Sequence, residues 1–148
     1  VSELIGLDIT DVNLSMGYIR CSNSKGERLI PVGNKAVDAL MLYLEKARNS
    51  MIKDADETAL FINRLGARIS RQGFWKIIKH YQESSGIDTE ITPHSLRHSF
   101  AAHLIQNGAD LQSLKSMMGH SDISSTQVYT CFLDENIKRV YEKTHPRA

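Results

Sequence analysis

The sequence predicts an α+β fold that is mostly α-helical and carries one small antiparallel sheet. Most of the 148 residues lie in segments where apolar side chains recur every three or four positions, the spacing of an amphipathic helix. Two short neighbouring runs, 18–22 and 27–32, have the composition of β-strands. Because no internal repeat, low-complexity tract or interior linker divides the chain, we expect a single domain over 1–148.

The two strand-like runs, YIRCS and ERLIPV, predict a β-hairpin. The residues between them, NSKG, are typical of a turn and place Lys25 at the hairpin tip. Further along, ALFI at 59–62 is a candidate third strand. It follows a polar segment, 50–58, which is expected to be a loop.

A helix is expected over 34–49, where apolar side chains share one side: Val37, Leu40, Met41 and Leu44. Three later helices have both start and stop signals. The bracketing pairs are Ser70 and Gly86, Thr92 and Gly108, and Asp110 and Gly119. A short helix behind Ser121 or Asp122 and a weakly amphipathic helix over 133–148 complete the predicted elements.

Composition restricts the class of protein. The chain is 41% hydrophobic and 24% charged, which is ordinary for a globular domain. It has no apolar run of membrane-spanning length and no signal-peptide pattern at its N-terminus, so we expect it in the cytoplasm, without a membrane partner. Cys21 and Cys131 lack metal-binding or redox spacing and are expected to be reduced.

The net charge of +1 argues against an indiscriminate polycation, but the basic residues are unevenly distributed. No acidic residue lies between Thr58 and Gln82, whereas basic residues recur there: Arg64, Arg68, Arg71, Lys76 and Lys79. Such a local basic surface is typical of phosphate-backbone binding, and a merely solvated face is the equal alternative. The interleaved aromatic residues keep helical spacing, which favours a place in the core.

The stretch ITPHSLRHSF, 91–100, places a positive charge among apolar positions. On a helix, Arg97 falls within the stripe formed by Leu96, Phe100, Ala101 and Leu104. A buried guanidinium is costly unless an anion or a set of acceptors meets it. His94, three residues earlier, can reach the same point. The alternative is an arginine satisfied by carbonyl groups, beside a half-exposed histidine.

Five polar residues together supply the groups needed for phosphoryl transfer through a covalent intermediate. They are a cation, an anion binder, two imidazoles and an oxygen nucleophile: Lys25, Arg97, His94, His120 and Tyr129.

The segment ITPHSLRHSFAAHLIQNGADLQSLKSMMGHSDISSTQVYT resembles the catalytic core of the tyrosine recombinases, the phage integrase family, and most closely its Xer-type members. An H-x-x-R, an L-x-x-x-x-G-H and a tyrosine nine residues later follow in the family's order. The resemblance implies a site-specific recombinase, active in DNA recombination or integration. It would cut and rejoin double-stranded DNA through a 3′-phosphotyrosyl link, without metal or other cofactor.

The resemblance also implies a role for each matching residue. Tyr129 would be the nucleophile, Arg97 would hold the non-bridging phosphate oxygens, and His94 would help to accept the tyrosine proton. His120 would donate a hydrogen bond to phosphate. Lys25 matches the lysine that protonates the leaving 5′-oxygen, although the loop after it is shorter than in Xer-type relatives.

Two departures from the family pattern concern the N-terminus. The family's first phosphate-binding arginine stands directly before a VSEL-like run, which here begins at Val1, and the N-terminal DNA-clamping domain is also absent. We therefore expect a truncated C-terminal catalytic domain that is inactive alone. The tail, 133–148, is implied to dock on a neighbouring subunit in a homo- or hetero-oligomer on DNA.

Two other classes of protein remain open. A metallohydrolase could use His94 and His98, four residues apart, but Ser95 stands where H-E-x-x-H has its glutamate. A non-catalytic helical DNA-binding or regulatory domain could use the same basic surface.

Overall fold

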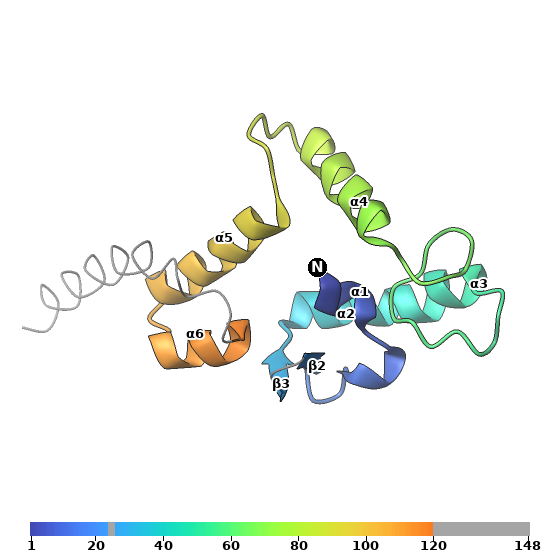
Figure 1. Cartoon of the computed structure of the whole chain (residues 1–148), viewed down its shortest axis with the longest axis horizontal. Helices are drawn as coiled ribbons and strands as arrows, with labels where there is room; N and C mark the ends of the chain where they lie inside the picture. Colours follow the sequence, from blue (N-terminus) through green and yellow to red (C-terminus); the bar gives the residue numbers. More distant parts are fainter. Residues whose placement is uncertain (24–25, 120–148) are drawn as a thin grey trace, which may run out of the picture. The chain divides into compact units, whose positions relative to one another are not determined.

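The computed structural model describes residues 1–23 and 26–119 and divides the chain into two compact units (Figure 1). The first unit, Val1–Ile91, contains a three-stranded sheet and the helices around it. The second unit begins at Thr92 and contains a pair of helices among its described residues. The mostly helical α+β fold predicted from the sequence is confirmed.

The first unit starts with a short helix and a 3₁₀ turn, continues through the sheet, and ends in helices. Its elements are α1 (Ser2–Gly6), η1 (Ile9–Asp11), β1 (Val12–Asn13), β2 (Tyr18–Asn23), β3 (Gly26–Pro31), α2 (Asn34–Leu42), η2 (Tyr43–Arg48), α3 (Asn49–Met51) and α4 (Arg71–Ser84). The second unit contributes α5 (Pro93–Gln106) and α6 (Leu111–Met118).

The sheet is antiparallel, with the order β1-β2-β3. β2 and β3 form the predicted hairpin, in a register that pairs Tyr18 with Pro31 and Asn23 with Gly26. Its core-facing side packs against the end of α1 and the segment after α3, where Leu7, Cys21 and Leu60 form a buried cluster. Burial raises the pKa of the Cys21 thiol.

The prediction of a third strand at 59–62 is wrong, because these residues form only isolated bridges. Their apolar character reflects burial, since Ala59 and Leu60 are fully buried. Their backbone groups bond to scattered partners instead of a neighbouring strand. The Leu60 N–H donates to the Leu7 carbonyl, and the Tyr43 hydroxyl accepts from the Ile62 N–H at 3.1 Å.

The helix expected over 34–49 is present, but its middle is a π-helix, η2. The wider turn changes which residues share a face, and Tyr43 and Arg48 both contact the 57–62 segment. Met41, predicted on the inner side, is 46% exposed.

The helix α4 begins and ends where the sequence predicts. The Ser70 hydroxyl accepts a hydrogen bond from the Gly73 N–H, and Gly86 follows with a positive φ of 64°. The predicted core role of its apolar side chains is only partly correct. Phe74 and Ile78 are half-buried, whereas Ile77 and Tyr81 are exposed, because α4 contacts α1 and leaves much of its own length uncovered.

Both helices predicted in the second unit are confirmed, but the predicted apolar stripe of α5 is not its buried side. Thr92 and Ser95 form a capping box at the start of α5, and the Asp110 carboxylate accepts from the Ser113 N–H at the start of α6. Hydrogen bonds from the side chain and the backbone N–H of Ser113 lower the pKa of Asp110. The core consists of Ala101, Ile105 and Leu114, with Leu104, Leu111 and Met118 packed against it.

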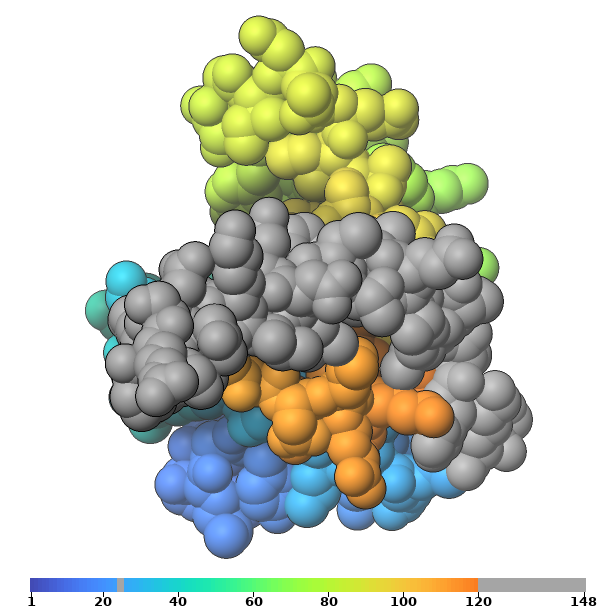
Figure 2. All heavy atoms as spheres, turned by 90° about the vertical axis from the view of Figure 1, so that its left-hand side faces the viewer, coloured from blue at the N-terminus to red at the C-terminus, as the bar shows by residue number. Residues whose placement is uncertain are grey.

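Leu96 and Phe100, predicted to belong to the buried stripe of α5, are each 46% exposed. The buried side of the helix is rotated toward Ala101 and Ile105, because α6 covers that side. In the space-filling view of Figure 2, atoms of α6, drawn in orange, are exposed on the face turned toward the viewer. The helices predicted over 121–130 and 133–148 lie outside the described residues. Among residues 1–23 and 26–119, no helix has the length and apolarity needed to cross a membrane.

Candidate functional site

Arg97 joins the two helices of the second unit. It lies on the α6-facing side of α5, its Nε is buried, and its Nη2 donates a hydrogen bond to the carbonyl of Met118. Met118 is the last residue of α6 and stands directly before Gly119 and His120 in the sequence. The guanidinium is therefore held where α6 ends, and a carbonyl group supplies one of the acceptors that a buried cation requires.

His94 lies in the first turn of α5, one turn before Arg97, and is exposed. The capping box of Thr92 and Ser95 fixes this turn, so the backbone that carries His94 is well defined. His98, four residues on, is also exposed.

Three of the five predicted catalytic residues, Lys25, His120 and Tyr129, lie outside the described residues. The structure describes the neighbours of two of them. Asn23 and Gly26, which form the last pair of the hairpin, flank Lys25, and Gly119 precedes His120. Gly119 follows α6 with a positive φ of 74°, a backbone conformation that glycine adopts more readily than other residues.

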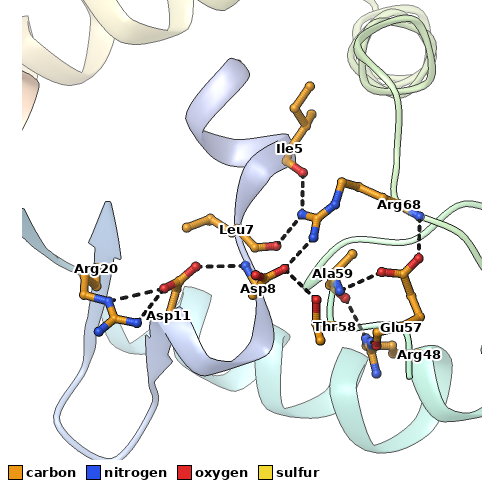
Figure 3. A network of polar contacts seen from close by, with 10 residues as sticks. All are labelled: Ile5, Leu7, Asp8, Asp11, Arg20, Arg48, Glu57, Thr58, Ala59 and Arg68. Carbon is orange, nitrogen blue, oxygen red and sulfur yellow. Dashed lines mark hydrogen bonds and ion pairs between the residues drawn. The ribbon is translucent and has the colours of Figure 1, made fainter. Parts of the chain in front are cut away.

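Arg68, one of the predicted DNA-binding residues, makes its contacts inside the first unit (Figure 3). Its guanidinium donates to the carbonyls of Ile5 and Leu7, both at 2.9 Å, and pairs with the Asp8 carboxylate. This hydrogen bond lowers the pKa of Asp8. Arg68 thus ties the end of α1 to the segment before α4.

The other predicted DNA-binding residues are exposed: Arg64, Arg71, Lys76 and Lys79. Of these, Arg71 donates a hydrogen bond to the Ser2 hydroxyl at 2.6 Å and so holds the start of α1. Lys76 and Lys79 lie one turn apart on α4, so they present charge on one side of that helix.

A second network, which the sequence did not predict, surrounds Arg48 (Figure 3). Arg48 is 4% exposed and donates to the carbonyls of Ala59 at 2.9 Å and Glu57 at 2.6 Å. The Glu57 carboxylate accepts from the backbone N–H groups of Ala59 and Arg68. Sequence spacing could not reveal these bonds, because they join a π-turn to a loop.

A third network, which the sequence also did not predict, lies near the turn end of the hairpin. The Glu3 carboxylate accepts two hydrogen bonds from Arg28, both at 2.7 Å, and one from the Asn23 side chain at 3.1 Å. The hydrogen bonds that Arg28 donates to Glu3 raise the pKa of Arg28, although burial opposes the charge. Neither the residue spacing nor the composition of this region predicts the ion pair between Glu3 and Arg28.

Within the described ranges, 1–23 and 26–119, no three histidine, cysteine, aspartate or glutamate residues gather as metal ligands would. His94 and His98 therefore gain no third ligand from these residues, and the metallohydrolase alternative gains no support from them.

The family model described as "Phage integrase family" matches residues 1–136. The chain belongs to the phage integrase family.

Curated relatives place it near the Xer-type members. It is 47% identical over 149 residues to "Tyrosine recombinase XerD" of Halalkalibacterium halodurans and 49% identical over 154 residues to "Tyrosine recombinase XerC" of Pelotomaculum thermopropionicum. Each alignment covers 100% of this chain and 50% of the relative, so the chain spans about half the length of these proteins. The resemblance to the Xer-type members is confirmed.

Solved structures agree with the fold. The crystal structure of XerA recombinase is 32% identical, with a TM-score of 0.81 over 99% of this chain and 53% of that one. A post-cleavage complex of XerH site-specific recombinase with palindromic difH substrate gives a TM-score of 0.75 at 23% identity, over 94% of this chain and 40% of that one, which supports the fold alone.

Proposed function

We propose that the protein is a Xer-type site-specific recombinase that cuts and rejoins DNA strands through a 3′-phosphotyrosyl intermediate. Family membership and the relatives named as tyrosine recombinases support the class of reaction. One observation of this chain carries the proposal furthest. The arginine of the H-x-x-R motif is bonded to the carbonyl directly before the G-H motif, so α5 and the end of α6 are held together.

In the proposed reaction the Tyr129 hydroxyl attacks the scissile phosphorus and its proton passes to His94. The new Tyr129–phosphorus bond forms as the bond from phosphorus to the 5′-oxygen breaks. The electron pair stays on that oxygen, which takes a proton from Lys25 to give a free 5′-hydroxyl. A 5′-hydroxyl of the partner strand then attacks the phosphotyrosine and reverses these steps, so no cofactor is consumed.

Arg97 and His120 would stabilise the charge that develops on the non-bridging phosphate oxygens. Donors already fixed in place cost no reorganisation during the reaction, and the bond to Met118 fixes Arg97 in this way. A guanidinium carries five N–H donors in a planar fork, so the bond to a carbonyl and a contact with phosphate are compatible.

DNA binding in this proposal depends on the exposed basic side chains of the first unit. Arg64, Lys76 and Lys79 would contact the phosphate backbone. Arg68 and Arg71 would act through the fold, because their guanidinium groups hold the two ends of α1.

The tail, 133–148, would connect subunits on DNA. We expect Ile137, Val140 and Tyr141 to face a neighbouring recombinase or, in an isolated monomer, to fold back on the same chain. A tail that changes between these two positions would make the position of Tyr129 depend on the assembly of subunits.

The 148 residues by themselves are expected to cleave inefficiently, since they do not include the first phosphate-binding arginine implied by the family pattern. Stabilising arginines in unrelated phosphoryl-transfer enzymes contribute about 10³ to 10⁵ in rate, so a loss of about thousandfold is expected. Single-turnover rates for this polypeptide and for one extended by its native upstream sequence would test this, and equal rates would contradict it.

The nucleophile is tested by covalent trapping. The chain, with any native sequence that precedes it, is incubated with a duplex selected from random DNA for binding and nicked beside the cleavage position. We expect a protein–DNA adduct on denaturing gels, and none with Tyr129→Phe. An adduct of undiminished yield from Tyr129→Phe would remove Tyr129 from the mechanism.

A further inference from the structure

The first turn of α5 is closed by hydrogen bonds between two residues, Thr92 and Ser95. The Ser95 hydroxyl accepts from the Thr92 N–H at 2.7 Å and donates to the Thr92 carbonyl at 2.8 Å. The Ser95 N–H donates to the Thr92 hydroxyl at 3.0 Å. One hydroxyl therefore binds both backbone groups of the residue before the helix, in a capping box where serine stands at the position usual for glutamate or glutamine.

His94 lies inside this closed turn. Its neighbours in the sequence are Pro93, whose ring restricts the backbone, and Ser95. The His94 side chain is exposed, and within residues 1–23 and 26–119 no hydrogen bond or ion pair holds it. In the described part of the chain, the place of the imidazole therefore depends on the backbone of the turn that carries it.

Arg97, one turn further on, is held by a different contact. Its guanidinium donates to the Met118 carbonyl at the end of α6. Residues three apart on a helix have their Cβ atoms about 5–6 Å from each other, so the imidazole of His94 and the guanidinium of Arg97 can reach one phosphate. Because Arg97 is anchored to α6, a loosened first turn would displace His94 and leave Arg97 in place.

We propose that Ser95 is a positioning residue that, through the first turn of α5, sets where His94 stands relative to Arg97. This inference rests on the proposed function, in which His94 accepts the proton of the nucleophile and Arg97 holds the phosphate. Ser95 itself would touch neither DNA nor the reacting atoms. Its effect on cleavage would therefore disappear once the imidazole is removed.

Two substitutions of nearly equal shape isolate the hydroxyl of Ser95. Ser95→Thr retains the hydroxyl and Ser95→Val carries a methyl group in its place, while both side chains are β-branched. Ser95 is exposed, so either side chain has room. Ser95→Ala removes the hydroxyl without added bulk and keeps the comparison informative if Ser95→Val does not fold.

Ser113→Ala is the matched control, because Ser113 occupies the same third position of α6. Its hydroxyl donates to the Asp110 carboxylate at 2.6 Å, and its N–H donates to the same carboxylate at 2.7 Å. It belongs to the same unit as Ser95. We expect Ser113→Ala to lower the stability of that unit and to leave the cleavage rate unchanged.

The experiment measures single-turnover cleavage of the nicked duplex at saturating protein, using the chain with any native sequence that precedes it. Each Ser95 variant is made both with His94 intact and together with His94→Gln. Urea unfolding of every variant sets a temperature at which all of them are folded. Two substitutions that act through one group have a joint effect smaller than the sum of their separate effects.

Ser95→Val and Ser95→Ala should each cleave about 10-fold more slowly, since a misplacement of about 1 Å can cost up to about 100-fold. Ser95→Thr should restore the unaltered rate, because its hydroxyl can close the box. With His94→Gln, the Ser95 variants should cause no further slowing. This pattern, with an unaffected Ser113→Ala, would support the role of Ser95.

The inference would be overturned if Ser95→Val and Ser95→Ala cleaved at the unaltered rate, or if Ser95→Thr were as slow as Ser95→Val. Equal slowing by the Ser95 variants with and without His94 would also overturn it, since Ser95 would then act on the fold or on DNA. Slowing by Ser113→Ala that matches Ser95→Ala would do the same.

The failure of the proposed function gives a different result. If His94→Gln cleaves at the unaltered rate, His94 does not accept the proton, and the inference about Ser95 fails with that role. If His94→Gln is slow and the Ser95 variants are not, the inference alone fails.

Discussion

At Arg97 a positive charge lies on the same side of α5 as Ala101, which is fully buried. The sequence indicated that such a charge needs acceptors, and left open whether a phosphate or carbonyl groups supply them. The bond to the Met118 carbonyl supplies one from the protein. Because Met118 is the last residue of α6, the same bond holds the guanidinium at the end of that helix.

Arg97→Lys is expected to lower the single-turnover cleavage rate by about 10²- to 10³-fold, the usual effect of losing one stabilising donor in a transition state. Lysine keeps the charge but lacks the planar fork that can meet a carbonyl and a phosphate together. His98→Gln, an exposed neighbour on the same helix, should leave the rate unchanged. A large loss with His98→Gln would instead favour a role for the His94 and His98 pair.

Asp8 makes the stability of the first unit depend on pH. Arg68 lowers the pKa of Asp8 below its ordinary 3.8 in the folded state. The stabilisation is therefore present above about pH 4 and is lost as the pH falls through the lower, folded-state pKa. Urea unfolding from pH 6 downward should show a decline in stability that is smaller in Asp8→Asn. The same decline in both proteins would mean that the contact with Arg68 contributes nothing.

At the scale of elements, local signals were sufficient for the helix ends. Ser70, Thr92 and Asp110 each cap the helix predicted for them, because a cap depends on residues within three positions. The segment 59–62 was misassigned because its partners, Leu7, Tyr43 and Arg48, lie far away in the sequence. An apolar run signals burial equally in a strand and in a buried loop.

The basic surface was predicted from charge alone, and the structure separates its members by what they contact. Arg68 is bonded to backbone carbonyls, whereas Lys76 and Lys79 are exposed on α4. The candidate catalytic set could be anticipated only as residue types and spacing. The hydrogen-bond networks of Arg28 and Arg48 could not be anticipated. The first depends on the strand register, and the second depends on a π-turn.

Lys76→Gln and Lys79→Gln should weaken DNA binding, each reducing the slope of log affinity against log salt by about 1, as expected for one lost phosphate contact. Arg68→Gln should instead lower the free energy of unfolding and leave the salt slope unchanged in the folded fraction. Titrations with duplex DNA at several salt concentrations, together with urea unfolding, measure both effects. A reduced salt slope in Arg68→Gln would restore that residue to the DNA surface.

At the scale of the whole molecule, the tail is proposed to link subunits. Deleting 133–148 should weaken DNA-dependent assembly without unfolding the core, because the buried clusters of the described residues lie upstream of it. Sedimentation of protein–DNA complexes measures the assembly, and circular dichroism checks the fold. Assembly that is unchanged by the deletion would place the subunit contact elsewhere.

The covalent link between Tyr129 and DNA tests the account most directly. A nicked duplex is trapped with the chain and any native sequence that precedes it, the adduct is digested with protease and nuclease, and the modified peptide is identified by mass spectrometry. We predict that the peptide containing Tyr129 carries a nucleotide joined through a 3′-phosphate. A nucleotide on another residue, or one joined through a 5′-phosphate, would contradict the proposed recombinase mechanism.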